Sequence, residues 1–187
     1  MCRVRYLPFH QKMLALCVLG HVLQLLLGAN AVLTAGALYG PDVMAGEWWR
    51  LITAGFLHGG LLHLGVNMFS LLVLGKGLEA LLDRSDRRMF PVLYLGSLLG
   101  GSLGALLLEF DIPAVGASGA IFGLLGASVS IPHRLGLGWN GFGVVPWLVL
   151  NLVFTFYSPG ISRGGHLGGL VAGLLVGYLL APRLREG

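Results

Sequence analysis

Residues 115–123 read Val-Gly-Ala-Ser-Gly-Ala-Ile-Phe-Gly and place a single hydroxyl, that of Ser118, among small side chains where a helix is predicted to begin. Small residues let membrane helices pack closely, so the segment by itself is typical of a helix contact. It also suits a nucleophile. Gly116 and Gly119 would leave room for a substrate carbonyl, and the first amides of the helix are free to bind an oxyanion. Whether Ser118 serves helix packing or acts as a nucleophile has to be judged from the rest of the sequence.

The composition indicates a polytopic membrane protein. Of the 187 residues, 56% are apolar and 11% are charged, whereas soluble domains carry about 25% charged residues. A soluble domain with so few charges could not cover its surface. No basic cluster is interleaved with aromatic residues, so we expect a lipid bilayer as surroundings and no nucleic-acid partner.

Six apolar segments are predicted to be membrane helices: residues 13–34, 61–82, 90–108, 118–131, 142–157 and 165–180. A span needs about 20 residues, so the fourth segment is short and the loop before it is expected to dip into the protein. Glu79, near the end of the second segment, is expected to reach the membrane surface by snorkelling. We therefore expect an all-α bundle of six membrane helices over residues 13–181, with a cytoplasmic head at residues 1–12 and a cytoplasmic tail at 182–187.

Basic residues are unevenly distributed over the predicted loops and ends. Nine lie on the side that carries both termini, and two, Arg50 and Arg163, lie on the other side. Because cytoplasmic loops are enriched in Lys and Arg, we expect cytoplasmic termini and a Ser118 that opens toward the exterior.

Three polar clusters fall at the same end of their predicted helices. His63 and Asn67 are four residues apart on one face of the second helix, Ser118 begins the fourth, and His166 begins the sixth. Ionisable residues inside a membrane are candidates for function. Two simpler interpretations stay open, because His63 could cap a loop and His166 could be a buried histidine bonded to a carbonyl.

The sixth predicted helix carries glycines four residues apart, Gly169, Gly173 and Gly177. Such a stripe forms a groove for a neighbouring helix. We expect it to pack against Gly119 and Gly123 of the fourth helix. That contact would bring His166 within reach of Ser118.

The chemistry of these residue types favours acyl transfer. A serine hydroxyl is a poor nucleophile unless a base takes its proton, and His166 can do so and return the proton to the leaving amine. The side chains of His63 and Asn67 and the backbone N–H of Ser118 can donate to a tetrahedral oxyanion. No acid lies close to His166 in the sequence, and Asp111 is the nearest acid before Ser118. We therefore predict a Ser–His dyad without an orienting carboxylate.

The ordered set of motifs resembles the rhomboid family of intramembrane serine proteases. The motifs are Gly46-Glu-Trp-Trp-Arg50, His58 with His63 and Asn67, Gly116-Ala-Ser-Gly119, and His166 with Gly169 and Gly173. The resemblance implies a six-helix bundle of the minimal bacterial type, set in the inner (cell) membrane of a bacterium. It also implies cleavage of single-pass membrane proteins within or near their spans, with no cofactor and no metal.

The resemblance also assigns roles residue by residue. The nucleophile is Ser118, the base is His166, and the oxyanion contacts are His63, Asn67 and Gly116. The first-loop and supporting residues are Trp49, Arg50, His58, Gly119, Phe122 and Gly169. Phe122 stands where the family often has a tyrosine against the histidine ring, so it keeps the stacking surface and loses a hydroxyl.

Other classes fit the sequence less well. A catalytically inactive rhomboid-like protein that binds membrane helices would typically lack the serine or the histidine, and both are present. A small transporter or channel would need a polar path, whereas the polar residues gather at one end of the helices. A zinc peptidase would need a motif such as HExxH, which the sequence lacks. An aspartyl protease would need two buried aspartates, and no Asp lies in the middle of a predicted span.

Overall fold

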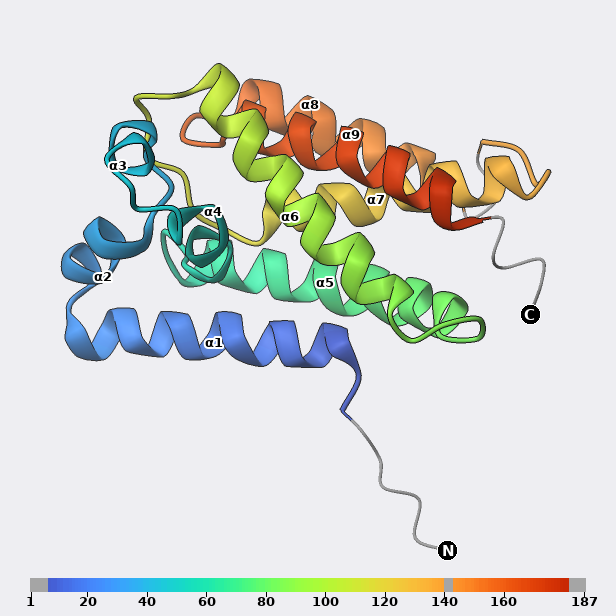
Figure 1. Ribbon diagram of the computed structural model, residues 1–187, viewed down its shortest axis with the longest axis horizontal. Helices are drawn as coiled ribbons and strands as arrows, with labels where there is room; N and C mark the ends of the chain where they lie inside the picture. The colour runs from blue at the N-terminus through green and yellow to red at the C-terminus, as the bar shows by residue number, and fades with distance from the viewer. Residues whose placement is uncertain (1–6, 140–142, 182–187) are drawn as a thin grey trace, which may run out of the picture.

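The computed structural model describes residues 7–139 and 143–181, which form helices joined by loops (Figure 1). In chain order these are α1 (Phe9–Leu27), α2 (Ala29–Gly36), α3 (Gly40–Met44), α4 (Arg50–Thr53), the 3₁₀ helix η1 (Ala54–Phe56), α5 (Leu61–Leu82), α6 (Met89–Leu108), α7 (Ser118–Arg134), α8 (Val145–Tyr157) and α9 (Arg163–Leu180). The all-α class predicted from the sequence is confirmed. The predicted tail, and residues 1–6 of the predicted head, lie outside the described residues.

Within the described residues, four helices are long and apolar enough to cross a membrane: α1, α5, α6 and α9. The apolar helix α8 has 13 residues and α7 has 17. At about 1.5 Å per residue, α7 is about 25 Å long and α8 about 20 Å. The chain is therefore a multi-pass membrane protein, and the count of six spans stays a prediction.

Helix α7 lies at the centre of the bundle. Every residue from Gly119 to Pro132 is buried, whereas the outer helices keep large apolar side chains exposed, such as Leu62 on α5 and Leu107 on α6. A helix surrounded by protein does not need the length or the uniformly apolar surface of a helix that faces lipid. This position explains why the segment was short and rich in small residues.

Glycines bring α7 and α9 into backbone contact. A Cβ atom on Gly169 would collide with the carbonyl oxygen of Gly119, and one on Gly173 with that of Gly123. The predicted packing of these two helices is therefore confirmed. Helix α6 meets α9 in the same way, because a Cβ atom on Gly104 would collide with the backbone of α9.

Several predicted helix boundaries differ from those of the structure. The apolar segment at residues 13–34 is divided at Gly28, whose φ of +93° ends α1 and starts α2. Glycine adopts this conformation without steric cost, so an apolar run conceals the break. The fourth helix extends beyond residue 131 to Arg134. Pro132 is tolerated because it lies in the last turn, where it removes one helical hydrogen bond.

Glu79 of α5 is buried and holds the start of α1, so the expected snorkelling is wrong. Its carboxylate accepts hydrogen bonds from the backbone amides of Phe9 at 2.5 Å and His10 at 2.9 Å. It also pairs with His10 Nδ1 at 2.6 Å. A carboxylate at the start of a helix satisfies free N–H groups and interacts favourably with the helix dipole. This contact ties α1 to α5, and it explains why α1 begins inside the predicted head.

We predict that Glu79→Ala lowers the free energy of unfolding by about 3 kcal/mol, because the buried N–H groups of Phe9 and His10 and the His10 ring would lose their acceptor. Unfolding of the protein in mixed micelles measures the change. Asp83→Ala is the matched control, since this carboxylate is exposed in the next turn. Equal stability of the two variants would contradict the role of Glu79.

We predict that Gly173→Ala lowers the free energy of unfolding by about 3 kcal/mol, since an added methyl would push α9 away from α7. The same substitution at Gly77 of α5 meets open space. There the gain in helix propensity is expected to stabilise the protein by up to about 1 kcal/mol. The two variants are compared in the same unfolding assay. If both had the same effect, backbone contact at Gly173 would not determine stability.

Candidate active site

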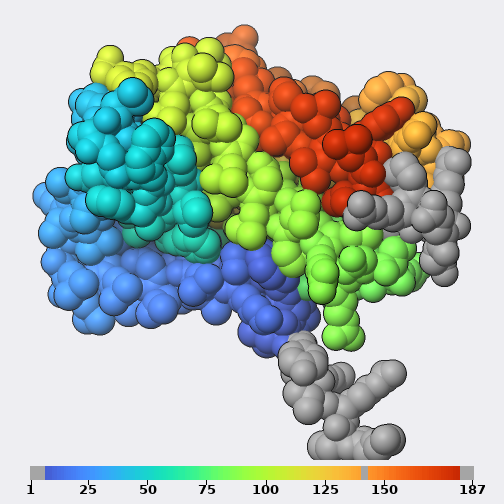
Figure 2. Space-filling view, in the orientation of Figure 1, coloured from blue at the N-terminus to red at the C-terminus, as the bar shows by residue number. Residues whose placement is uncertain are grey.

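The loop before α7 is held by the long connection between α2 and α5. Leu38 and Ala114 exchange two backbone hydrogen bonds of 2.9 Å, and the N–H of Gly116 donates to the carbonyl of Ala54 at 2.9 Å. Figure 2 shows this connection packed over one end of α6 and against α1. These bonds satisfy backbone groups that would otherwise be unpaired inside the protein, and they fix where Ser118 begins α7.

Arg50 organises that connection from within. Its guanidinium is buried and pairs with Asp42 at 2.9 Å and Glu47 at 2.5 Å. It also donates to the carbonyl of Ala37 at 2.8 Å. The neighbouring Trp49 keeps its ring exposed while its indole N–H donates to a carbonyl of α2. The planar fork of arginine suits several oxygen acceptors at once.

Gly116 leaves a space that Ser118 and His63 share. Its φ of +125° requires glycine. A Cβ atom there would lie 2.9 Å from Nε2 of His63 and 3.7 Å from Oγ of Ser118. The N–H of Gly59 donates to Nδ1 of His63 at 3.4 Å, which leaves Nε2 as the protonated nitrogen. His63 therefore presents an N–H donor to a space that also adjoins the serine hydroxyl.

Asn67 and His58 support His63 from two sides. The side-chain amide of Asn67 donates to the carbonyl of His63 at 2.8 Å and has a second N–H available. The ring of His58 packs edge-on against His63, with centroids 5.2 Å apart. Burial, and then the nearby rings of His63 and His21, lowers the pKa of His58 to about 4. The ring of His58 is therefore neutral at pH 7.

The first turn of α9, which carries His166, is fixed by a carboxylate at the end of α6. Glu109 accepts hydrogen bonds from the hydroxyl of Ser162 at 2.5 Å and the backbone N–H of Arg163 at 2.8 Å. The Ser162 oxygen in turn accepts the N–H of Gly165 at 2.9 Å, as an N-cap does. Glu109 therefore sets the position from which the imidazole projects.

The imidazole of His166 is buried and held on two sides. Its ring stacks on Phe122, with centroids 4.0 Å apart and planes at 19°. Nδ1 lies 2.7 Å from the hydroxyl of Thr155 on α8. Phe122 is one helical turn after Ser118, so the stacking places the ring over the first turns of α7. No carboxylate of the described residues forms a hydrogen bond or ion pair with His166.

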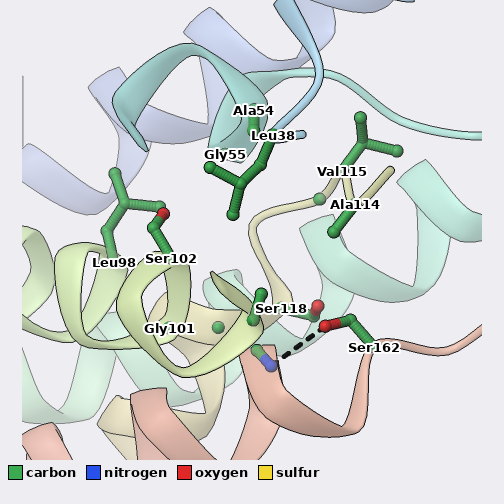
Figure 3. Close-up of a pocket in the computed structure, with 14 residues that line it drawn as sticks. Leu38, Ala54, Gly55, Leu98, Gly101, Ser102, Ala114, Val115, Ser118 and Ser162 are labelled. Atoms are coloured by element: carbon green, nitrogen blue, oxygen red, sulfur yellow. Dashed lines mark hydrogen bonds between the residues drawn. The ribbon is translucent and has the colours of Figure 1, made fainter. Parts of the chain in front are cut away.

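A small cavity of about 40 Å³ adjoins Ser118 (Figure 3). Figure 3 shows Leu98 and Ser102 of α6 across the cavity from Ala114 and Val115 of the loop before α7. Its lining is formed by small and apolar residues, including Gly101, Gly119 and Gly165. The volume is enough for a water molecule or a methyl-sized group.

The structure gathers most of the predicted site residues at one end of the bundle. Those that meet around the start of α7 are Ser118, Gly116, Gly119, His63, His58, Asn67, Phe122, His166 and Gly169. The contacts of Trp49 and Arg50 lie within the connection instead. Two residues were missed. Thr155 is the hydroxyl one turn after Asn151 in an apolar helix, and Glu109 ends α6, whereas the acid considered from the sequence, Asp111, is exposed.

Known proteins resemble the chain over most of its length. The Rhomboid domain family matches residues 45–183. RHOMBOID-like protein 5 of Arabidopsis thaliana is 39% identical over 162 residues, which cover 81% of this chain and 50% of the relative. Rhomboid protease GluP of Bacillus subtilis is 35% identical over 139 residues, or 73% of this chain and 27% of the relative. The putative rhomboid protease YdcA of the same organism is 35% identical over 149 residues, or 78% and 73%. The chain thus spans half or less of the length of the first two.

Proposed function

Since the chain belongs to the rhomboid family, we propose that it is an intramembrane serine protease that acts through a dyad of Ser118 and His166. The observation that carries this proposal is the stacking of His166 on Phe122, one turn beyond Ser118, at 4.0 Å. This contact supports His166 as the base, because it holds the imidazole over the first turns of the helix that Ser118 begins. The substrates would be single-pass membrane proteins, cut within or near their spans.

In the proposed reaction, Nε2 of His166 takes the proton of the Ser118 hydroxyl as Oγ attacks the substrate carbonyl. The resulting oxyanion would occupy the space beside Gly116, where it accepts hydrogen bonds from His63 Nε2–H, the Asn67 amide and the Ser118 backbone N–H. His166 then gives its proton to the leaving amine as the peptide bond breaks. A water molecule, deprotonated by His166, releases the acyl group from Ser118.

The distribution of basic residues supports an orientation with cytoplasmic termini and a site that opens toward the exterior. Nine basic residues lie on the predicted cytoplasmic side and two on the other. The bacterial inner membrane fits the resemblance to minimal bacterial members, and relatives also occur in plants. A cysteine-accessibility experiment on intact cells would report the side on which residue 160, in the loop before α9, is exposed.

We predict that a fluorophosphonate labels the detergent-solubilised protein and that labelling is lost in Ser118→Ala. Ser118→Ala and His166→Ala should each reduce turnover by about 10⁴-fold or more, because members of a nucleophile–base pair act as a unit. Thermal unfolding verifies that the fold is intact. His133→Ala is the matched control, since this histidine stacks on Trp139 at the other end of α7. A folded wild-type protein that takes up no label would favour the inactive, helix-binding alternative.

We predict that Asn67→Ala lowers kcat by about 10²-fold and leaves KM nearly unchanged, since an oxyanion donor acts in the transition state. The loss should be smaller than that of Ser118→Ala, because His63 and the backbone N–H remain. Steady-state cleavage of a fluorescent single-pass peptide in liposomes separates the two constants. An increase in KM at constant kcat would assign Asn67 to substrate binding instead.

A further inference from the structure

Helix α8 buries a polar side chain against the rest of the bundle. Along Val145–Tyr157, all of which the structure describes, Thr155 is the one buried residue. Its side chain is fully enclosed, while large apolar neighbours such as Phe154 and Phe156 are exposed. In a helix that faces lipid, the inward position would ordinarily carry an apolar or small side chain. A hydroxyl there needs hydrogen-bond partners.

The hydroxyl of Thr155 has two hydrogen-bond partners, and their chemistry determines to which of them it donates. Oγ1 lies 2.7 Å from the carbonyl oxygen of Asn151, to which it donates. It also lies 2.7 Å from Nδ1 of His166. A hydroxyl has one hydrogen and two lone pairs. With its hydrogen on Asn151, the oxygen can only accept, so Nδ1 of His166 must be the protonated nitrogen.

This assignment fixes the remaining nitrogen of the ring. In a neutral imidazole one nitrogen carries the hydrogen and the other is an acceptor, and the partner of one sets the state of both. Nδ1–H therefore leaves Nε2 unprotonated. The stacking on Phe122 also restricts rotation of the imidazole about its bond to Cβ. The base is thus held in both orientation and tautomer without a carboxylate.

We infer that Thr155 is the positioning residue of the site: it holds His166 as the Nδ1–H tautomer, with Nε2 free to accept the proton of Ser118. The inference rests on the proposed function for the identity of the base. When Nε2 gains the proton, the threonine oxygen still accepts from Nδ1–H and so stabilises the imidazolium. In this respect a neutral hydroxyl performs the orienting task of a third catalytic group.

A threonine that only bonds to its own helix would look different. Ser128 of α7 donates to the carbonyl of Leu124, one turn earlier, at 2.8 Å. That back-bonding satisfies a hydroxyl inside a helix with no further partner. Thr155 makes the same bond and in addition faces a ring nitrogen at short range. The second contact is what distinguishes an orienting hydroxyl from a satisfied one.

The experiment compares Thr155→Val, which keeps the shape and removes the hydroxyl, with Thr155→Ser, which keeps the hydroxyl. The readout is inactivation by a fluorophosphonate. Thr155→Val should lower the maximal rate about 10- to 100-fold, part of the contribution of a general base, at an unchanged half-saturating concentration. Thr155→Ser should stay within about threefold of wild type. Ser128→Ala, the matched control, should match wild type.

Nitrogen-15 NMR of the labelled His166 ring tests the tautomer directly. The wild type should show a protonated Nδ1 and an unprotonated Nε2 above neutral pH, and Thr155→Val should shift toward the other tautomer. A wild-type ring with a protonated Nε2 would overturn the inference, even if Thr155→Val failed to fold. Unchanged inactivation of a folded Thr155→Val would also overturn it, while labelling of Ser118 would leave the proposed function standing. A wild type that takes up no label would reject the proposed function instead.

Discussion

Backbone contact between α7 and α9 is the interaction on which the rest of the structure depends. In a bilayer, moving an apolar side chain from lipid into a helix interface lowers the free energy little, because lipid is equally apolar. Membrane helices therefore associate largely through close van der Waals packing. Gly169 and Gly173 allow α9 to rest against the carbonyls of Gly119 and Gly123. The contact begins at the ends of both helices that carry Ser118 and His166. Packing and site are therefore consequences of one arrangement of small residues.

A second constraint holds the start of α7 in place. The loop that precedes it has no helix of its own, and irregular backbone packed inside a membrane protein is tolerated only where its polar groups are paired. Ala114 and Gly116 find their partners in Leu38 and Ala54 of the long connection. The ion pairs of Arg50 stiffen that connection. The connection between α2 and α5 thus helps to determine where Ser118 lies, although Ser118 belongs to α7.

The sequence predicted the elements whose physical cause is periodic or local. The bounds of α5 and the glycine contact of α9 with α7 follow from hydrophobic length and from a spacing of four residues. The break at Gly28 and the burial of Glu79 could not be predicted in this way. The break at Gly28 is concealed because glycine is common in apolar runs, and the burial of Glu79 depends on which helix lies alongside α5, which a single sequence does not reveal.

The same limit applies to the site. Ser118, His63 and His166 could be proposed as candidates because ionisable or nucleophilic residues among small ones are unusual in an apolar chain. Thr155 and Glu109 were not, since a threonine in a membrane helix and a glutamate at a helix end are ordinary. Their roles appear only when α8 and the end of α6 are placed beside α9. Residues that orient others are hidden in a sequence because the need for them arises in the assembled bundle.

In the proposed reaction, the attachment of α8 would affect the timing of catalysis. Its buried contact is a hydrogen bond to His166, whereas α7 and α9 share a continuous glycine interface. Helices packed through many glycines resist separation, and a helix that buries only Thr155 along Val145–Tyr157 opens at a lower cost in free energy. Any outward movement of α8 that admits a substrate would break the contact to His166. The Thr155 hydroxyl would contact His166 again only when α8 closes. His166 would therefore be oriented to act as a base only after α8 has closed over a bound substrate.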